Sequence, residues 1–362
     1  MSAPGRLSVS APGRICLFGE HQDFLGLPVI AAAVDRRIRI DGTRRGDRQF
    51  VVQMPDIDDE DRFEVGGDLP YRQARDYLRS TVNVLRREGM RFEAGYDCVM
   101  TSTIPINAGT SSSSAMIVAW TRFLLATQPH AIASDPESIA RLAHRAEVLE
   151  FNEPGGMMDH FAAAYGGLIF VDTVPPFKAE RLPARLDGFV LADSLQRKQT
   201  LEVLRKSKED VLAGVEVLRA NVPGFSLATV AHEEAARWYP RMTPDSARKI
   251  ASNLANRDLC QQAKAMLASG QVDPPMLGRM LTEHHRHLSE GLLISTPLID
   301  GMLQAALAAG ALGGKINGSG GGGCFFAYAP DNREAVRRAC EQAGAQAWAV
   351  RIDEGAAAEG EG

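Results

Sequence analysis

The 362-residue sequence lacks the features by which membrane, secreted and nucleic-acid-binding proteins are usually recognised. It contains no run of roughly 18 apolar residues, so no transmembrane helix is expected, and no long apolar stretch follows residues 1–6, so no signal peptide is expected. Its five cysteines are scattered without a CxxC pair, which is typical of reduced thiols in a cytosol. The net charge of -5 lacks the basic excess of most nucleic-acid-binding proteins. We therefore expect a cytoplasmic protein, a monomer or a simple homo-oligomer, that binds neither nucleic acid nor membrane.

The length predicts two domains, because one hydrophobic core rarely serves so long a chain. Hydrophobic residues make up 45% of the chain and charged residues 23%, as in ordinary globular proteins. A Pro-rich stretch at residues 174–183 is the expected boundary. This gives an N-terminal domain of residues 1–182, a C-terminal domain of residues 183–354, and a tail of residues 355–362 whose Ala, Gly and Glu content predicts disorder.

Local patterns predict alternating strands and helices. Strands are expected at residues 7–17, 29–40, 96–104, 167–172, 188–192 and 324–329. Helices are expected at residues 71–88, from the serines after 109 through 125, at 138–151 and from 159 to 165, and most of 200–308 should be helical. Residues 56–68 and 313–323 are expected to be loops, because the first segment is acidic and the second is rich in glycine.

A run of small and hydroxylated residues lies between a predicted strand and a predicted helix. Residues 104–115 read IPINAGTSSSSA. Small residues let backbone N–H groups approach an anion, and a helix start adds unpaired donors. The alternative is a serine-rich loop that caps the helix, although one cap needs only one serine. No Walker A pattern occurs, so a nucleotide site would need another design.

Two further segments carry polar groups that could act on a ligand. Residues 12–24 read PGRICLFGEHQDF and place Glu20, His21 and Asp23 in one turn, which could bind a ligand rich in hydroxyls; an exposed polar hairpin is the commoner alternative. Asp159 follows a Gly-Gly-Met-Met turn and could be a base or an electrostatic partner. Its alternative, and commoner, role is to cap the following helix.

The glycine-rich segment 313–323 formally contains GxGxxG, at Gly318, Gly320 and Gly323. A dinucleotide fold would need this pattern after an early strand and before a helix. Here it lies near the C-terminus and precedes a predicted strand, so a dehydrogenase is not indicated. The His-His-Arg-His run at 284–287 raises a zinc hypothesis, which is weak because it lacks convincing partner ligands.

These three loops, in this order, resemble the three signature motifs of the GHMP kinases. Residues 12–24 are similar to the galactokinase signature PGR…GEHTDY. Residues 105–115 are similar to the phosphate loop P-x-x-x-G-L-x-S-S-A, with Thr110 in place of the usual Leu. Residues 313–324 resemble the third motif, and residues 157–159 resemble the galactokinase G-I-M-D segment. The resemblance covers roughly residues 9–328.

The resemblance implies an α/β (α+β) two-domain GHMP kinase fold. Its N-terminal half would resemble ribosomal protein S5 domain 2, its C-terminal half would be ferredoxin-like, and the active site would lie in the cleft between them. It also implies an enzyme that uses ATP and Mg²⁺.

The same resemblance assigns roles to individual residues. Asp159 would take or orient the proton of the acceptor hydroxyl, and Arg14 would stabilise charge and lower the pKa of Asp159. Ser113 and Glu147 would bind Mg²⁺. The residues implied to bind the acceptor are Glu20, His21, Asp23 and Gly156. Those implied to bind ATP are Ala108, Gly109, Thr110, Ser111, Ser112, Ser113, Ser114, Gly320 and Gly321.

The motifs depart from the galactokinase pattern near the acceptor. Phe24 and Leu25 stand where Tyr and Asn are usual, and Gly155 replaces a common Cys. The expected activity is phosphorylation of a sugar hydroxyl, and the first candidate is the anomeric 1-hydroxyl of a galactose-like sugar. A uronic acid, a pentose or an aminosugar is also an open alternative for the acceptor. The alternatives are a mevalonate- or homoserine-type kinase, which acts on an open-chain alcohol, and a non-catalytic protein that binds a metabolite.

Overall fold

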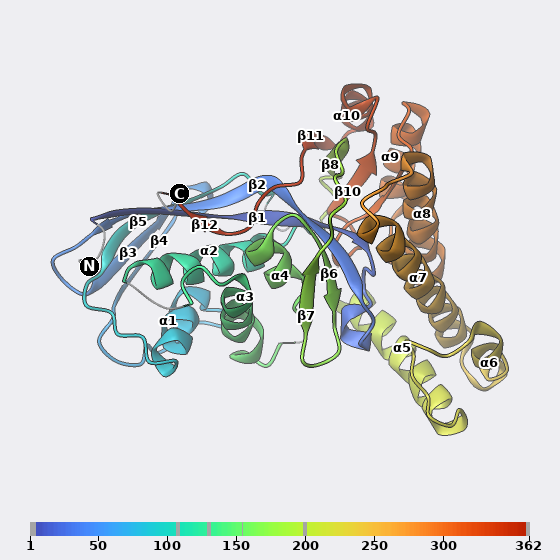
Figure 1. Ribbon diagram of the computed structural model, residues 1–362, viewed down its shortest axis with the longest axis horizontal. Helices are drawn as coiled ribbons and strands as arrows, with labels where there is room; N and C mark the ends of the chain where they lie inside the picture. The colour runs from blue at the N-terminus through green and yellow to red at the C-terminus, as the bar shows by residue number, and fades with distance from the viewer. Residues whose placement is uncertain (1–4, 106–108, 129–131, 154, 198–200, 360–362) are drawn as a thin grey trace.

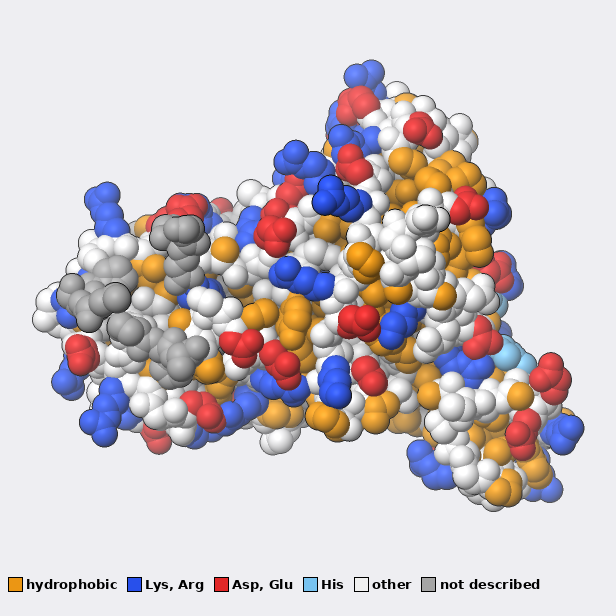
Figure 2. Space-filling model, in the orientation of Figure 1, with side chains coloured by type: hydrophobic (Ala, Val, Ile, Leu, Met, Phe, Trp, Pro, Cys, Tyr) orange, Lys and Arg blue, Asp and Glu red, His pale blue; other side chains and the backbone are white. Residues whose placement is uncertain are grey.

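The computed structural model describes residues 5–105, 109–128, 132–153, 155–197 and 201–359. Its strands form one eight-stranded and one four-stranded sheet, and helices pack against both (Figure 1). Within the described residues, no helix is long and apolar enough to cross a membrane. On the face shown in Figure 2, acidic and basic side chains are interspersed over both halves of the molecule.

A long antiparallel hairpin of β1 and β2 is the centre of the eight-stranded sheet. Its pairing runs from Arg6 with Thr43 to Phe18 with Ile30. The sheet order is β12-β1-β2-β5-β3-β4, with β6 paired to β2 and β7 to β6. The strands are β1 Arg6–Phe18, β2 Val29–Arg44, β3 Gln49–Met54, β4 Asp59–Glu64, β5 Tyr96–Ser102, β6 Leu168–Asp172, β7 Lys178–Arg181 and β12 Ala357–Ala358.

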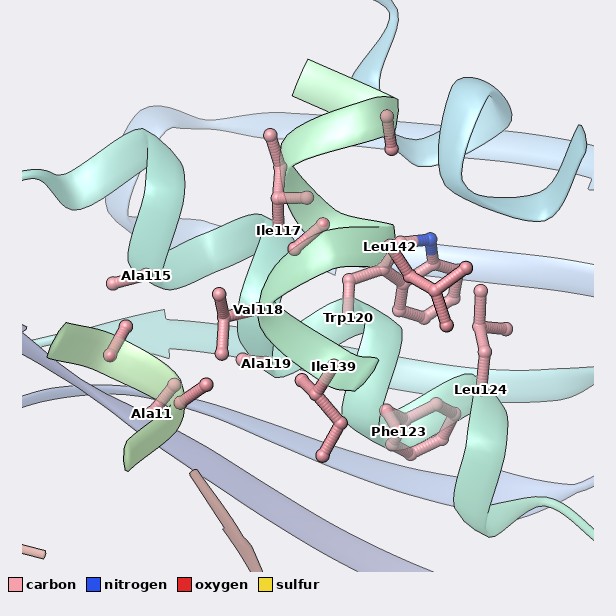
Figure 3. Packing of buried hydrophobic residues seen from close by; sticks show 14 of the residues in the cluster. Ala11, Ala115, Ile117, Val118, Ala119, Trp120, Phe123, Leu124, Ile139 and Leu142 are labelled. Atoms are coloured by element: carbon pink, nitrogen blue, oxygen red, sulfur yellow. The ribbon is translucent and has the colours of Figure 1, made fainter. Parts of the chain in front are cut away.

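Four helices cover one face of this sheet (Figure 1). They are α1 Tyr77–Arg87, α2 Ser112–Ala126, α3 Pro136–His144, which continues into a π-helical turn at Arg145–Leu149, and α4 Met158–Tyr165. The core is built around α2, which is apolar after its serines: Trp120 and Phe123 stack with ring centroids 5.6 Å apart. Ile139 and Leu142 of α3 pack over α2 in the same cluster (Figure 3). This packing fixes the serine-rich start of α2 against the sheet.

The four-stranded sheet is antiparallel in the order β11-β8-β10-β9. Its strands are β8 Phe189–Asp193, β9 Gly313–Ile316, β10 Cys324–Tyr328 and β11 Gln346–Val350. The helices of this half are α5 Leu201–Asn221, α6 His232–Ala236, α7 Pro244–Ala268, α8 Pro274–Arg286, α9 Pro297–Ala308 and α10 Arg333–Gln342. Of these, α8, α9 and α10 pack against the four-stranded sheet, and α5 and α6 pack on α7. The far end of the β1–β2 hairpin enters the core of this half, where Phe18 and Phe326 belong to one buried cluster. The two halves therefore meet where β1 turns into β2.

Most predicted elements are confirmed, including the strands of the β1–β2 hairpin and the helical region 200–308. Three expectations are wrong. Residues 56–68 are not all loop, because β4 pairs with β3, a strand that was not predicted. The glycine-rich segment begins as strand β9 rather than as loop. The tail is not disordered at residues 355–359, because β12 pairs with β1, Val9 opposite Ala358; residues 360–362 lie outside the described residues. The expected boundary at 182/183 lies between β7 and β8, and remains a prediction.

Candidate active site

A cleft of about 330 Å³ lies where the β1–β2 turn, α2, α4 and the glycine-rich loop meet. The predicted site residues that line it are Arg14, Glu20, His21, Asp23, Ser113, Ser114, Glu147, Gly156 and Asp159. The remaining lining residues are Phe24, Val148, Glu153, Gly155, Met158, His160, Gly318 and Ser319. Six other predicted residues do not line the cleft: Gly109, Thr110, Ser111, Ser112, Gly320 and Gly321. Ala108 lies outside the described residues. The structure thus brings together residues from all three sequence motifs.

Asp159 is held by Arg14 from the neighbouring strand β1. Arg14 Nε donates to Asp159 Oδ1 at 2.7 Å, and Arg14 Nη1 donates to the Gly109 carbonyl at 2.6 Å. Asp159 is in the first turn of α4, where the helix dipole favours a negative charge. The N-cap of α4 is Met157 and no side chain caps it, so the alternative of Asp159 as a helix cap is wrong.

The charges around Asp159 favour its ionised form. Burial raises the pKa of this carboxyl, but the Arg14 guanidinium and the nearby Ser111 hydroxyl lower it more, and the net result is a pKa below the ordinary value. The same carboxylate helps to raise the pKa of Arg14 against the effect of burial. Asp159 is therefore a charged acceptor that can take a hydrogen bond from a substrate hydroxyl.

Glu147 lies on the π-helical turn that follows α3, facing the start of α2. His160 Nε2 donates to Glu147 Oε2 at 2.7 Å. Burial raises the pKa of Glu147, but His160 and the hydroxyls of Ser114 and Ser113 lower it below its ordinary value. An ionised carboxylate beside a serine hydroxyl offers the oxygen ligands that Mg²⁺ prefers. The Ser113 and Glu147 side chains thus fit this ion.

The start of α2 presents backbone donors to the cleft. Ser111 is the N-cap with a left-handed φ of 59°, and its side chain makes no capping hydrogen bond. The first N–H groups of a helix have no partner within the helix, and the dipole makes them attractive to an anion. The side chain of Ser111 therefore does not cap the helix, as the alternative interpretation would require. Thr110, by contrast, is buried and accepts a hydrogen bond from the Arg14 N–H through its carbonyl at 3.2 Å.

The β1–β2 turn forms the other wall of the cleft. His21 has a left-handed φ of 61°, and its Nε2 lies 3.3 Å from the Gly318 carbonyl oxygen. Burial and the negative charge of Asp159 raise the pKa of Asp23. A Cβ on Gly156 would lie 1.9 Å from Asp23 Oδ2, so a larger residue there would displace the Asp23 carboxylate. The turn therefore presents several hydrogen-bonding groups within one small space.

The third motif supports this wall with two polar residues that the sequence analysis did not single out. Asn317 accepts from the Cys16 N–H at 2.8 Å and donates to the Gly109 carbonyl at 2.9 Å, so it joins the first two motifs. Lys315 Nζ donates to Glu20 Oε2 at 2.8 Å. The available signal was the presence of these two polar side chains within a segment otherwise made mostly of glycine.

The glycines of the third motif permit a close approach of two loops. A Cβ on Gly318 would lie 2.5 Å from the Gly109 carbonyl oxygen. The Gly321 N–H donates to the Ile294 carbonyl at 2.8 Å, which holds the loop on the C-terminal half. The contacts of Gly320 and Gly321 with ATP remain a prediction.

The histidines of the run 284–287 have separate partners. His284 Nδ1 is near the Leu17 carbonyl oxygen, whereas His285 pairs with Asp300 and His287 with Glu283. No group of three or more His, Cys, Asp or Glu among the residues with assigned positions could hold a metal ion. The zinc hypothesis gains no support from this arrangement.

Comparisons with known families cover most of the motifs. Residues 1–43 match the galactokinase galactose-binding signature, residues 76–167 match the GHMP kinases N terminal domain, and residues 263–346 match the GHMP kinases C terminal domain. The chain is a GHMP kinase. Members of this family are ATP-dependent kinases of small molecules, so the predicted family and the use of ATP are supported.

The relatives of this kinase include galactokinases and mevalonate kinases. A galactokinase from Roseiflexus sp. (strain RS-1) is 29% identical over 326 aligned positions, and the match covers 87% of this chain and 81% of that protein. A mevalonate kinase from Thermococcus onnurineus (strain NA1) is also 29% identical, over 97% of both chains. Sequence identity alone therefore does not separate the two groups.

Solved structures show the same fold. Lactococcus lactis galactokinase complexed with galactose has a TM-score of 0.84 at 19% identity, and the match covers 97% of this kinase and 95% of that chain. Methanococcus jannaschii mevalonate kinase has a TM-score of 0.73 at 15% identity, with 96% and 98% covered. The predicted two-domain GHMP kinase fold is confirmed.

Proposed function

We propose that this kinase transfers the γ-phosphoryl group of ATP to a hydroxyl of a sugar, with the anomeric 1-hydroxyl of a galactose-like monosaccharide as the first candidate. The supporting observation is the position of the Arg14–Asp159 pair, 2.7 Å between Nε and Oδ1, in the same cleft as Glu20 and Asp23. A base next to several hydroxyl-binding groups suits an acceptor that carries several hydroxyls. The match of residues 1–43 to the galactose-binding signature supports the same proposal.

The protein groups have distinct roles in this proposal. The Asp159 carboxylate orients the acceptor hydroxyl and takes its proton, while the Arg14 guanidinium keeps that carboxylate ionised and stabilises negative charge nearby. The N–H groups at the start of α2 would hold phosphate oxygens, and Ser113 and Glu147 would hold Mg²⁺. When bound, ATP would supply the phosphoryl group, and Mg²⁺ would neutralise part of the negative charge of the phosphate oxygens. Phosphoryl transfer depends mainly on such positioning and charge stabilisation.

A mevalonate-type activity is the second candidate, because mevalonate kinases are among the relatives. A hydroxy acid would need a cation in the cleft for its carboxylate. The two strongest candidates are already paired, Arg14 with Asp159 and Lys315 with Glu20. The acceptor wall is otherwise acidic, which favours a sugar. A non-catalytic role is disfavoured because a protein that only binds a metabolite has no use for the paired Asp159 and Arg14.

A panel of acceptors tests the proposal. ADP release would be followed with hexoses, pentoses, uronic acids and aminosugars, and with mevalonate and homoserine, each against a blank without acceptor. We expect the highest kcat/KM with a galactose-like sugar, and the position of the phosphate in the product is then read by NMR. Activity with mevalonate or homoserine only would favour the second candidate, and tight ligand binding without turnover would favour the non-catalytic one.

A further inference from the structure

Lys315 is a lysine inside the protein. It lies on β9 opposite Phe326 of β10, and its side chain is fully buried. Its Nζ donates to the Cys16 carbonyl at 2.7 Å and to Glu20 Oε2 at 2.8 Å, and it is 5.2 Å from the centre of the Phe326 ring. A lysine from the C-terminal half thus reaches across to the acceptor turn of the N-terminal half.

The pair constrains Glu20 more than an ordinary surface ion pair would. The Glu20 side chain is only 3% exposed, yet Glu20 lines the cleft. A buried carboxylate is costly without a charged partner, and removing one member of a buried pair leaves the other uncompensated. Because Lys315 occupies Oε2, the oxygen left for a ligand is Oε1.

We infer that Lys315 is a positioning residue for the acceptor, which holds Glu20 so that one carboxylate oxygen accepts a hydrogen bond from a single substrate hydroxyl. This inference rests on the proposed function, because it takes Glu20 to bind the acceptor. Lys315 itself does not touch the acceptor, since it lies beneath Glu20 and is fully buried. Recognition of one acceptor hydroxyl by the N-terminal half therefore depends on a side chain of the C-terminal half.

A purely structural role for Lys315 makes a different prediction. If the lysine only joined the two halves, its removal would lower the melting temperature without changing how the enzyme ranks acceptors. Asn317, two residues later, already joins the halves through Cys16 and Gly109. The decisive measurement is thus acceptor selectivity rather than stability.

The test uses Lys315→Met, which keeps the length of the side chain and removes the ammonium. For the acceptor that the panel identifies, kcat/KM is measured with the parent compound and with each analogue that lacks one hydroxyl. The Glu20→Gln variant identifies the hydroxyl that Glu20 binds. In this variant, removal of that hydroxyl from the acceptor should no longer lower kcat/KM strongly. In Lys315→Met, the ratio of kcat/KM for the parent compound to kcat/KM for the analogue without that hydroxyl should fall by about tenfold or more. The acceptor KM should rise, and the KM for ATP should stay within about twofold of the wild-type value.

Lys249→Met is the matched control. Lys249 is also a buried, ion-paired lysine of the C-terminal half, but its partner Asp210 is outside the cleft, with Nζ 2.7 Å from Oδ2. This control should lower stability and keep the selectivity of the wild type. Lys315→Arg should recover part of the lost discrimination, because it restores the positive charge, and it also serves if Lys315→Met does not fold.

Two outcomes would overturn the inference. One is Lys315→Met with lowered stability but unchanged selectivity; the other is a crystal structure of that variant in which the Glu20 carboxylate has not moved. The crystal structure needs no substrate, so it separates failure of this inference from failure of the sugar kinase proposal. A variant with displaced Glu20 in an enzyme that phosphorylates no sugar would refute the proposed function alone.

Discussion

The two walls of the cleft are assembled in different ways. The wall that we propose to bind phosphate and Mg²⁺, called the phosphate wall here, is built from helices of the N-terminal half, where α2, the turn carrying Glu147 and α4 pack against one another. The C-terminal half contacts it at Gly109, through Asn317 and Gly318. The acceptor wall is one turn of the N-terminal half enclosed by the C-terminal half. Lys315 and Gly318 contact it from the third motif, and Gln22 Nε2 donates to the Asn253 carbonyl of α7 at 2.6 Å.

This difference predicts which kinetic constants respond to which part of the protein. The phosphate wall is a local unit, so changes in it should alter turnover and metal use while acceptor affinity stays the same. The acceptor wall depends on contacts between the halves; Leu27, for example, is in a buried cluster with Val211, Leu218 and Leu254 of α5 and α7. Changes in those residues of the C-terminal half that contact this turn directly should therefore alter acceptor recognition.

The largest expected effect is that of Asp159→Asn. The amide keeps the shape but cannot take a proton, so kcat should fall by about 10²–10⁴-fold. Binding of ATP, measured by calorimetry, should stay close to that of the wild type because Asp159 is not part of the α2 donors. Turnover near the wild-type value would remove Asp159 from the chemistry.

The next largest effect should follow Arg14→Met. In the wild type, the pKa of Asp159 is below its ordinary value, so Asp159 is ionised above that pKa, and activity is lost only as pH falls through it. Without the guanidinium, burial dominates and the pKa of Asp159 rises. The acid limb of the pH profile of kcat/KM should therefore move to higher pH. An unmoved acid limb would show that another group controls it.

Glu147→Gln tests whether the phosphate wall binds Mg²⁺ independently of the acceptor wall. Loss of the carboxylate should raise the Mg²⁺ concentration for half-maximal activity by about 10–100-fold, while the acceptor KM at saturating Mg²⁺ is unchanged. Glu150→Gln is the control, because Glu150 is three residues further on and pairs with Arg87 outside the cleft. An equal rise in both variants would mean that Glu147 has no special part in metal binding.

The same difference decides what could be predicted from the sequence. The start of α2 could be predicted because consecutive serines followed by an apolar run indicate a helix start. The Lys315–Glu20 pair joins positions 295 residues apart, and no local pattern indicates such a contact. Strand β4 was missed because its acidic composition resembles a loop, yet Asp61 is buried there in an ion pair with Arg79, 2.6 Å between Oδ2 and Nη1.

The ordered tail was missed for a related reason. Strand pairing uses backbone hydrogen bonds, such as that from the Glu359 N–H to the Ser8 carbonyl at 2.8 Å. A composition of Ala, Gly and Glu carries no trace of a partner strand about 350 residues away in the chain. Contacts of this kind become visible only when the fold brings the two segments together.

Gly156→Ala should have the smallest effect, and it is confined to the acceptor wall. The added methyl would lie 1.9 Å from Asp23 Oδ2, so the Asp23 carboxylate must move. We expect the acceptor KM to rise by about tenfold, roughly the loss of one good hydrogen bond, with the KM for ATP and the Mg²⁺ requirement unchanged. Gly66→Ala is the control, because a Cβ there meets nothing within 4 Å. If Gly156→Ala instead raised the KM for ATP as much as that for the acceptor, the two walls could not be independent, since a clash with Asp23 would then have spread to the start of α2.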